Sequence, residues 1–336
     1  MKAIVQTTYG APEQVLIPGE IERPIPNAGE VLVRVRASSV NTPDCIATLG
    51  VPYVLRPWVV GLTGPVSAVR GSDVAGVVEA VGPGVADFAP GDEVFGSVWI
   101  ASGFARGAQG AFCEYTVVPA SQLAKKPAST SFEEAAGAVM SGVTTLQALR
   151  DVAKVTPGAR VLINGASGGL GTFAVQIAKA MGAVVTGVCS TRNVELVRSL
   201  GADHVIDYTQ DDYTKGETRY DVIFDNVMNH PPAASAAVLA PGGRFIPNSV
   251  GDNRWLGTLP QMAYAGLFKS KDWRTVEYRP VRENLEALAA LLESGAVRVV
   301  VDRVYPLEQA GAAVAHMASR RARGKVVLQV SEAGRA

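Results

Sequence analysis

The stretch that most constrains the fold is a glycine-dense turn between an apolar strand and an apolar helix. Residues 161–171 read Val-Leu-Ile-Asn-Gly-Ala-Ser-Gly-Gly-Leu-Gly. Gly165, Gly168 and Gly171 permit a tight turn and a close approach of the backbone to a ligand. The apolar spacing that follows predicts a helix over 169–181, whose N-terminus would present unpaired N–H groups. Glycine spacing alone also occurs in plain loops, but this order of strand, turn and helix indicates a site for the pyrophosphate of a dinucleotide.

The composition is that of a globular chain without a charge bias. Its 336 residues suffice for two domains of about 150 residues each. Lysine plus arginine and aspartate plus glutamate both number 31, so charge favours neither nucleic acid nor an anionic membrane as a partner. No apolar run approaches the ~18 residues of a membrane span. We expect a small-molecule substrate.

The cysteines and the first residues point to the cytoplasm. Cys45, Cys113 and Cys189 are odd in number and far apart, which argues against a disulfide framework and suits a reducing compartment. Residues 1–6 already read as a strand, leaving no room for a signal peptide. We therefore expect a cytoplasmic protein.

The pattern of strands and helices changes along the chain. The first 120 or so residues are β-rich: Val31, Val33 and Val35 alternate with other residues, as in a half-exposed strand. From about residue 125, strands alternate with helices, which predicts a doubly wound parallel sheet. Its expected strands are 160–163, 184–189, 204–207, 221–227 and 243–248, and its expected helices are 169–181 and 193–200. Ser131 and Glu134 form a capping box before an earlier helix.

The sequence pattern at the end of the chain resembles the pattern at its beginning. A helix over 281–293 and strands near 297–304 and 325–330 are expected there. We therefore predict a β-rich substrate domain from 1–124 and 279–336, and a dinucleotide domain over 125–278. Residues 52–70 carry three prolines and little periodicity, which is typical of a long binding loop. A short strand over 273–278 is expected at the sheet edge, where it would pair with a second subunit.

Several motifs, in order along the chain, resemble one known family. They are Gly-Glu-Val-Leu-Val-Arg-Val-Arg-Ala at 29–37, Gly-Ser-Asp-Val-Ala-Gly-Val-Val-Glu-Ala-Val-Gly at 71–82, Gly-Asp-Glu-Val-Phe at 91–95, Leu-Gly-Ala-Asp-His-Val-Ile-Asp-Tyr at 200–208 and Gly-Lys-Val-Val-Leu at 324–328. End to end, the chain resembles the medium-chain dehydrogenase/reductase superfamily in its zinc-free quinone oxidoreductase-like branch. The resemblance implies an α/β protein with a GroES-like β-rich catalytic domain and a Rossmann domain with a doubly wound parallel sheet. It also implies a homodimer.

The residues at the metal positions of this superfamily predict that no metal is bound. Zinc-dependent members hold catalytic zinc with a cysteine in the segment matching 40–44 and a His-Glu pair matching 72–73. Here these positions carry Asn41, Ser72 and Asp73, so the thiolate and imidazole ligands are missing. No cysteine lies between residues 91 and 110, so the structural zinc lobe is missing too. Reduction of a conjugated acceptor, whose charge spreads into an enolate or quinol anion, is easier without metal than oxidation of an alcohol.

The end of the second strand of the dinucleotide domain favours NADPH over NADH. Ser190 lies nineteen residues after Gly171, and no carboxylate occurs before Glu195. Arg192 would supply donors to a 2′-phosphate; the alternative is a solvated residue at a helix start. In the resembled family a tyrosine matching Tyr208 also touches this phosphate, whereas a lysine of many relatives is replaced by Asn193. The resemblance implies cofactor contacts at Asn41, Thr144, Ala166, Ser167, Gly168, Gly169, Leu170, Ser190, Arg192, Tyr208, Asn226 and Val227.

Asn41, Thr144 and Tyr53 are the candidate catalytic residues. By resemblance, Asn41 and Thr144 lie near the nicotinamide and offer neutral donors to an acceptor carbonyl. The alternatives are that Asn41 bonds backbone as a turn residue and that Thr144 bonds back within its helix. Tyr53, in the 52–70 loop, is a candidate proton donor, and solvent is the alternative source of the proton.

Together these observations predict a zinc-independent, NADPH-dependent oxidoreductase that transfers hydride to a quinone or an α,β-unsaturated carbonyl. Two alternatives stay open. One is a dedicated enoyl or enone reductase of a small-molecule biosynthetic pathway, and the other is a non-catalytic NADPH-binding redox sensor.

Overall fold

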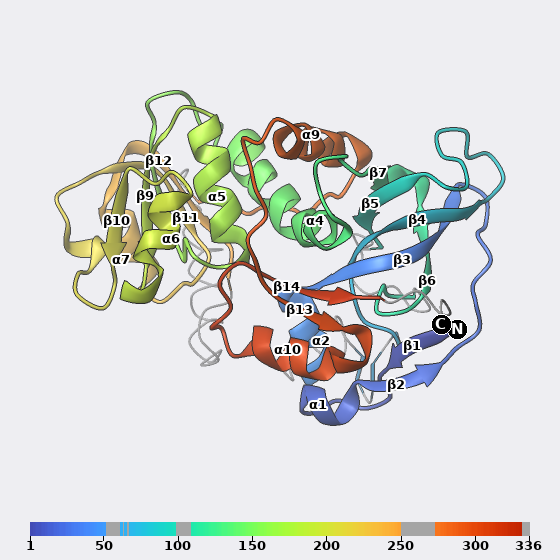
Figure 1. Ribbon diagram of the computed structural model, residues 1–336. Coiled ribbons are helices and arrows are strands. Elements are labelled where there is room, and N and C mark those ends of the chain that lie inside the picture. The colour runs from blue at the N-terminus through green and yellow to red at the C-terminus, as the bar shows by residue number, and fades with distance from the viewer. Residues whose placement is uncertain (52–60, 63, 66, 99–108, 250–272, 331–336) are drawn as a thin grey trace. The chain divides into compact units, whose positions relative to one another are not determined.

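The computed structural model describes residues 1–336 except 52–60, 63, 66, 99–108, 250–272 and 331–336. The chain divides into two compact units (Figure 1). The first contains Met1–Val143, Arg279–Gly295 and Val299–Ala336, and the second contains Thr144–Tyr278 and Ala296–Arg298. The domain limits expected from the sequence stay a prediction.

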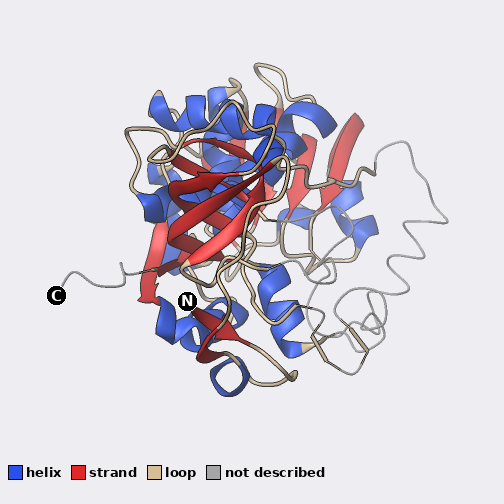
Figure 2. Ribbon diagram, turned by 90° about the vertical axis from the view of Figure 1, so that its right-hand side faces the viewer, coloured by secondary structure: helices blue, strands red, loops and turns tan. Residues whose placement is uncertain are grey.

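The first unit is built on a seven-stranded sheet that combines both ends of the chain. Its strand order is β13-β14-β3-β4-β5-β7, and β6 also pairs with β3. All pairs are antiparallel except β13 with β14. The strands are β3 (Glu30–Val40), β4 (Asp73–Val81), β5 (Glu93–Ser97), β6 (Tyr115–Pro119), β7 (Leu123–Lys125), β13 (Val301–Pro306) and β14 (Lys325–Gln329). A separate pair, β1 (Lys2–Val5) and β2 (Ile17–Glu20), lies beside the N-terminus (Figure 2).

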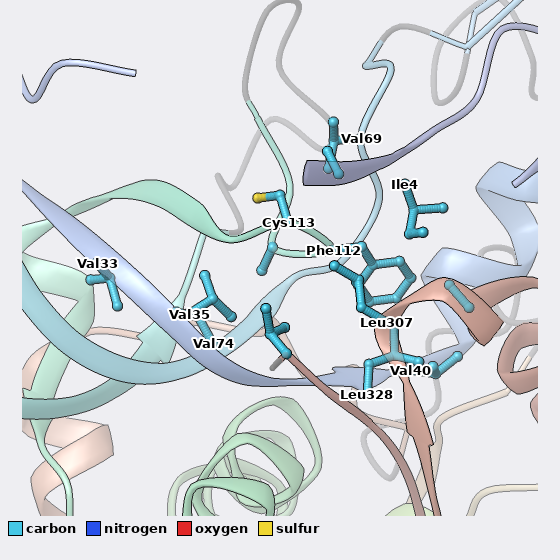
Figure 3. Close-up of a cluster of buried hydrophobic side chains, with 14 of the residues drawn as sticks. Ile4, Val33, Val35, Val40, Val69, Val74, Phe112, Cys113, Leu307 and Leu328 are labelled. Carbon is cyan, nitrogen blue, oxygen red and sulfur yellow. The ribbon is translucent and has the colours of Figure 1, made fainter. Parts of the chain in front are cut away.

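The alternating valines lie in β3, as the sequence predicts. Val31, Val33 and Val35 are each at most 2% exposed and belong to the hydrophobic core of the first unit. Figure 3 shows Val33 and Val35 in this core, together with residues from distant segments such as Ile4, Phe112 and Leu328. Leu32 on the opposite face is buried as well, whereas Arg34 and Arg36 of that face are partly exposed.

Five helices accompany this sheet in the described part of the first unit. They are α1 (Pro12–Val15), α2 (Thr42–Leu49), α4 (Phe132–Leu146), α9 (Arg282–Glu293) and α10 (Ala310–Ala318), and the last residues of α4 belong to the second unit. The predicted capping box begins α4. The Ser131 backbone N–H donates to Glu134 Oε2 at 2.9 Å, and the Glu134 N–H donates to Ser131 Oγ at 3.1 Å.

The second unit is the predicted doubly wound parallel sheet. Its strand order is β10-β9-β8-β11-β12, and all pairs are parallel. The strands are β8 (Arg160–Asn164), β9 (Val184–Cys189), β10 (His204–Asp207), β11 (Tyr220–Asp225) and β12 (Leu239–Pro247). Helices α5 (Gly169–Ala180), α6 (Val194–Ser199) and α7 (Pro232–Ala237) connect them. The chain order reverses at β8, and at such a point a crevice forms outside the carboxyl ends of the strands.

The strand predicted over 273–278 is reduced to a single bridge. Trp273 pairs in parallel with Phe245 of β12, and the Arg274 N–H donates to the Phe245 carbonyl at 3.1 Å. No strand is assigned to residues 274–278. The predicted strand was therefore too long. A short segment at a sheet edge has only one neighbouring strand to pair with, and the local sequence pattern does not show how far that pairing extends.

A buried carboxylate anchors the start of α2 in the first unit. Asp44 is 0% exposed, and its Oδ2 accepts from the Asn41 backbone N–H at 2.8 Å. Its Oδ1 accepts from the Gly71 N–H at 3.1 Å. Asp44 therefore ties the first turn of α2 to the segment that leads into β4.

This burial predicts a pH dependence of stability. Burial is the largest cause that raises the pKa of Asp44, from 3.8 to about 7, and the nearby Asp73 raises it further, against the two N–H donors and Arg70. Because the folded state keeps the proton that the unfolded state has lost, this contribution is complete below pH 4 and is lost as the pH rises toward 7.

We expect wild-type stability to fall relative to Asp44→Asn by at most about 1.4 kcal/mol per pH unit between pH 4 and 7. Urea unfolding of both proteins over this range measures the difference between the two curves. Parallel curves would show that Asp44 does not titrate in this window.

Candidate functional site

The glycine turn at the end of β8 has the backbone geometry of an anion site. The N–H groups of Gly165 and Ala166 both donate to the Val188 carbonyl, at 3.1 and 3.0 Å, which fixes the turn beside β9. Gly165 has a φ of +79°, and a Cβ on Gly171 would lie 2.1 Å from the Gly165 carbonyl oxygen. Side chains are therefore excluded at both positions.

The start of α5 leaves this turn partly open to solvent. Ser167, Gly168, Gly169 and Leu170 are of intermediate exposure, while Ala166 is buried. The first N–H groups of a helix have no partner within it, and α5, with 12 residues, carries a full N-terminal dipole. These residues fit the pyrophosphate of a nicotinamide dinucleotide.

The ends of β9 and β10 bring together the residues expected at the cofactor ribose. Cys189 at the end of β9 pairs with Asp207 at the end of β10, and the Tyr208 N–H donates to the Cys189 carbonyl at 3.0 Å. Ser190 directly follows β9. Arg192 is exposed on the next turn, and Tyr208 is 57% exposed.

Asn193 has a role that the sequence did not reveal. Its Nδ2 donates to Ser167 Oγ at 2.9 Å and to Ser190 Oγ at 3.3 Å, so it links the glycine turn to the end of β9. Its side chain is 5% exposed, and its Oδ1 has no hydrogen-bond partner among the described residues. The signal in the sequence was its position, which matches a lysine in many members of the resembled family.

The end of β11 lies on the other side of the turn. Asp225 Oδ1 accepts from Asn164 Nδ2 at 2.8 Å and from the Val227 N–H at 3.0 Å. The Asn226 N–H donates to the Asn164 carbonyl at 3.2 Å. Asn226 and Val227 are therefore held at the carboxyl end of the sheet, next to the glycine turn.

In the first unit, Asn41 belongs to a buried polar cluster with Ser39, Asp73, Ser141 and Lys325, which we call the Lys325 cluster. Lys325 Nζ donates to Asn41 Oδ1 at 2.6 Å and to Ser141 Oγ at 3.0 Å. Asn41 Nδ2 donates to Asp73 Oδ2 at 2.9 Å, and Ser39 Oγ donates to the same oxygen at 2.6 Å. All five residues are at most 3% exposed.

The charges of the Lys325 cluster depend on each other. Burial lowers the pKa of Lys325, while the carboxylates of Asp73 and Asp44 raise it. Burial raises the pKa of Asp73, while the Lys325 ammonium and the donors Ser39 and Asn41 lower it. On balance burial prevails, so the pKa of Asp73 lies above its usual value and that of Lys325 below, and each partner's charge opposes the shift that burial causes in the other.

The Lys325 cluster does not fit a zinc ion. Among residues 1–336 without the undescribed segments, no group of three His, Cys, Asp or Glu side chains converges on a metal position. Asn41 Oδ1, the oxygen that a zinc ion would need, already accepts a hydrogen bond from the Lys325 ammonium. The other oxygens of the cluster are the hydroxyls of Ser39 and Ser141 and the carboxylate of Asp73, whereas catalytic zinc is held by three protein ligands drawn from Cys, His, Asp and Glu.

The other catalytic candidates are Thr144 and Tyr53. Thr144 lies in the last turns of α4, is 8% exposed, and belongs to the second unit. Its hydroxyl has no hydrogen bond to any described residue, which gives no support to the back-bonding alternative. Tyr53 lies outside the described residues.

Comparison with known proteins supports one family over the whole chain. The model of the alcohol dehydrogenase GroES-like domain matches residues 27–128, and that of zinc-binding dehydrogenases matches residues 200–328. A chloroplast envelope quinone oxidoreductase homolog of Arabidopsis thaliana is 30% identical over 98% of both chains. A trans-enoyl reductase, pgmF, of Aspergillus terreus is 33% identical over 90% of this chain and 87% of its own.

Solved structures agree. The quinone oxidoreductase from Coxiella burnetii has a TM-score of 0.83 at 26% identity and covers 98% of this chain and 99% of its own. The CurK enoyl reductase has a TM-score of 0.80 at 25% identity, with the same coverage. Within the described part of the chain, no helix has the length and apolar character to cross a membrane. The chain belongs to the medium-chain dehydrogenase/reductase superfamily, whose quinone oxidoreductase-like members it resembles in sequence and fold.

Proposed function

We propose that this protein is a zinc-independent, NADPH-dependent oxidoreductase that reduces a quinone or an α,β-unsaturated carbonyl compound. One observation carries the proposal: at the metal positions of the superfamily, Asn41 accepts from the Lys325 ammonium at 2.6 Å and donates to Asp73 at 2.9 Å. The Lys325 ammonium thus supplies a positive charge next to Asn41 without a metal ion. The relatives named as quinone oxidoreductase and trans-enoyl reductase support the reaction class.

The residues have distinct tasks in this reaction. When bound, the cofactor would supply the hydride, to the β-carbon of an enone or to one carbonyl oxygen of a quinone. The N–H groups of the glycine turn hold the pyrophosphate. Asn41 and Thr144 offer hydrogen-bond donors to the enolate or quinol oxygen, on which the negative charge develops. A proton from solvent, or from Tyr53, completes the reduction.

The preference for NADPH is supported by the charges at the ends of β9 and β10. Ser190 brings no negative charge, and Arg192 is exposed beside it. Asp207 is the nearest carboxylate along β10, but its oxygens already accept from Thr191, Thr209 and Gln210. A 2′-phosphate would therefore meet the guanidinium of Arg192 and the Tyr208 hydroxyl.

Arg192→Ala should raise the KM for NADPH by about 10- to 100-fold, because a charge-assisted hydrogen bond is worth about 1.5–3 kcal/mol. The KM for NADH should not change, since NADH lacks the phosphate. Arg198→Ala is the matched control, because Arg198 is an exposed arginine of the neighbouring α6 that pairs with Glu195. An equal change for both cofactors would contradict the assignment of Arg192.

The reaction itself is tested with NADPH deuterated at C4, on each face in turn, and a panel of quinones and enones. The protein is first treated with EDTA and its zinc content is measured by mass spectrometry. We expect turnover without zinc, and we expect that added zinc will not raise the rate. The reason is that the Lys325 ammonium, which belongs to the chain, would already supply the positive charge. Zinc-dependent turnover would refute the proposal.

The labelled product separates the alternatives. Deuterium at the β-carbon of an enone indicates a C=C reductase, including the dedicated enoyl or enone reductase of a biosynthetic pathway. Loss of NADPH that depends on quinone and yields unlabelled quinol indicates quinone reduction. Tight NADPH binding without turnover of any acceptor indicates the redox sensor.

We also propose a cytoplasmic homodimer. Trp273 lies against β12, at the edge of the parallel sheet, where a second subunit could add its own backbone. Light scattering at micromolar concentration should give twice the mass of one chain, and a monomer would refute the dimer.

A further inference from the structure

Lys325 is a buried lysine with hydrogen-bonding capacity to spare. Its side chain amine contacts Asn41 Oδ1 at 2.6 Å and Ser141 Oγ at 3.0 Å, and the residue is 2% exposed. An ammonium has three donors, so one N–H has no partner among the described residues. Lysine is almost never fully buried unless it is paired, and its partner here is Asp73, across the Asn41 amide.

Strand pairing fixes the place of Lys325. It is the first residue of β14, and its neighbour Val326 pairs with Val40, which directly precedes Asn41. Its stem lies against α4, where a Cβ added to Gly137 would come within 3.6 Å of Lys325 Cβ. The ammonium is therefore held beside Asn41 by backbone pairing, and its stem packs against α4 near Gly137.

The two charges set the orientation of the Asn41 amide. Its oxygen faces the Lys325 ammonium, and its nitrogen faces Asp73 Oδ2 at 2.9 Å. Turning the amide over would place N–H groups against an ammonium and an oxygen against a carboxylate. With its oxygen bound to Lys325, the Asn41 amide can offer a substrate oxygen only its N–H groups. Its second N–H makes just the long contacts of 3.3 and 3.4 Å to Ser39.

We propose that Lys325 is the positioning residue of the reduction. Its ammonium holds the Asn41 amide as a donor toward the acceptor oxygen and supplies the positive charge that zinc supplies in zinc-dependent members. This inference rests on the proposed function. The polarity supports it, because a donor whose amide oxygen is bound to a cation is strengthened toward a developing anion.

A purely structural role accounts poorly for this lysine. Replacing a buried ion pair by apolar residues of similar volume is often neutral or stabilising. A chain that needed only a stable contact between β14 and α4 would therefore lose nothing if apolar residues replaced both Lys325 and Asp73. The pair of Lys325 and Asp73 instead fixes the orientation of the Asn41 amide, with its oxygen toward Lys325 and its nitrogen toward Asp73.

The first experiment compares Lys325→Met with Lys126→Met. Lys126 is a matched control because it is also nearly buried in the first unit, with its Nζ bound to the carbonyls of Pro127 and Thr130 at 3.0 and 2.7 Å. With the acceptor found for the wild type, Lys325→Met should lower kcat by about 10²-fold, the effect of losing one transition-state donor. The KM for NADPH should not change, and Lys126→Met should leave kcat unchanged.

A kinetic isotope effect separates positioning from general damage. With C4-deuterated NADPH, the isotope effect on kcat should rise in Lys325→Met, because hydride transfer becomes more rate-limiting. A lower kcat with an unchanged isotope effect would mean a loss of folded enzyme and would overturn the proposal.

A double variant guards against misfolding. Lys325→Met alone leaves Asp73 buried without its counter-ion, so its Tm should fall. Adding Asp73→Asn removes both charges and should restore the Tm while kcat stays low. If the double variant recovers both the Tm and the wild-type kcat, Lys325 is only a counter-ion and the proposal is overturned.

One readout needs no turnover. In protein labelled with ¹⁵N-asparagine, the Asn41 Nδ2 resonances are identified by their loss in Asn41→Ser. They should shift and exchange faster with solvent in Lys325→Met but not in Lys126→Met, and unchanged resonances would overturn the positioning role. Wild type that reduces no acceptor defeats the proposed function and this inference together, whereas active wild type with equally active Lys325→Met defeats only the inference.

Discussion

The contact between the Lys325 ammonium and the Asn41 amide joins parts of the chain that lie 284 residues apart. Through Ser141 and Asp73 it also includes α4 and the first residue of β4. Neither charge is tolerable in the interior without the other. The four segments must therefore assemble together, and the Lys325 cluster marks the point where the two ends of the chain become one unit.

Asn41 is held in two independent ways. Its backbone N–H binds the buried Asp44, which also accepts from Gly71, while its side chain lies between Lys325 and Asp73. The segments around Asn41 and around Asp73 are thus connected by two carboxylates, one through main chain and one through side chains. This double attachment leaves the amide little freedom, which is what a group that must meet a developing charge requires.

Local patterns predicted most of the fold. The alternation of Val31, Val33 and Val35, the strand–helix alternation after residue 125 and the capping box of Ser131 all depend on neighbours in sequence, and all three are present in the structure. The glycine turn was equally readable, because the backbone itself forms that site. The structure of the segment after Trp273 could not be predicted in this way, because its pairing depends on β12 rather than on its own residues.

The Lys325 cluster and the link made by Asn193 could not be predicted, for a related reason. Each is a set of side-chain contacts between segments whose closeness follows only from the sheet order. A lysine at the start of a strand and an asparagine after one both have ordinary solvated roles, and no spacing distinguishes them.

This difference separates the two halves of the proposed function. Cofactor class follows from a backbone motif in one unit, so it can be recognised from a few glycines. The choice of acceptor follows from side chains in the other unit, where a charge-balanced cluster with a fixed amide suits an acceptor oxygen that gains charge only during reaction. In the proposed reaction the oxygen of a conjugated carbonyl or quinone becomes negative only on reduction, and the N–H groups of Asn41 would then meet that charge.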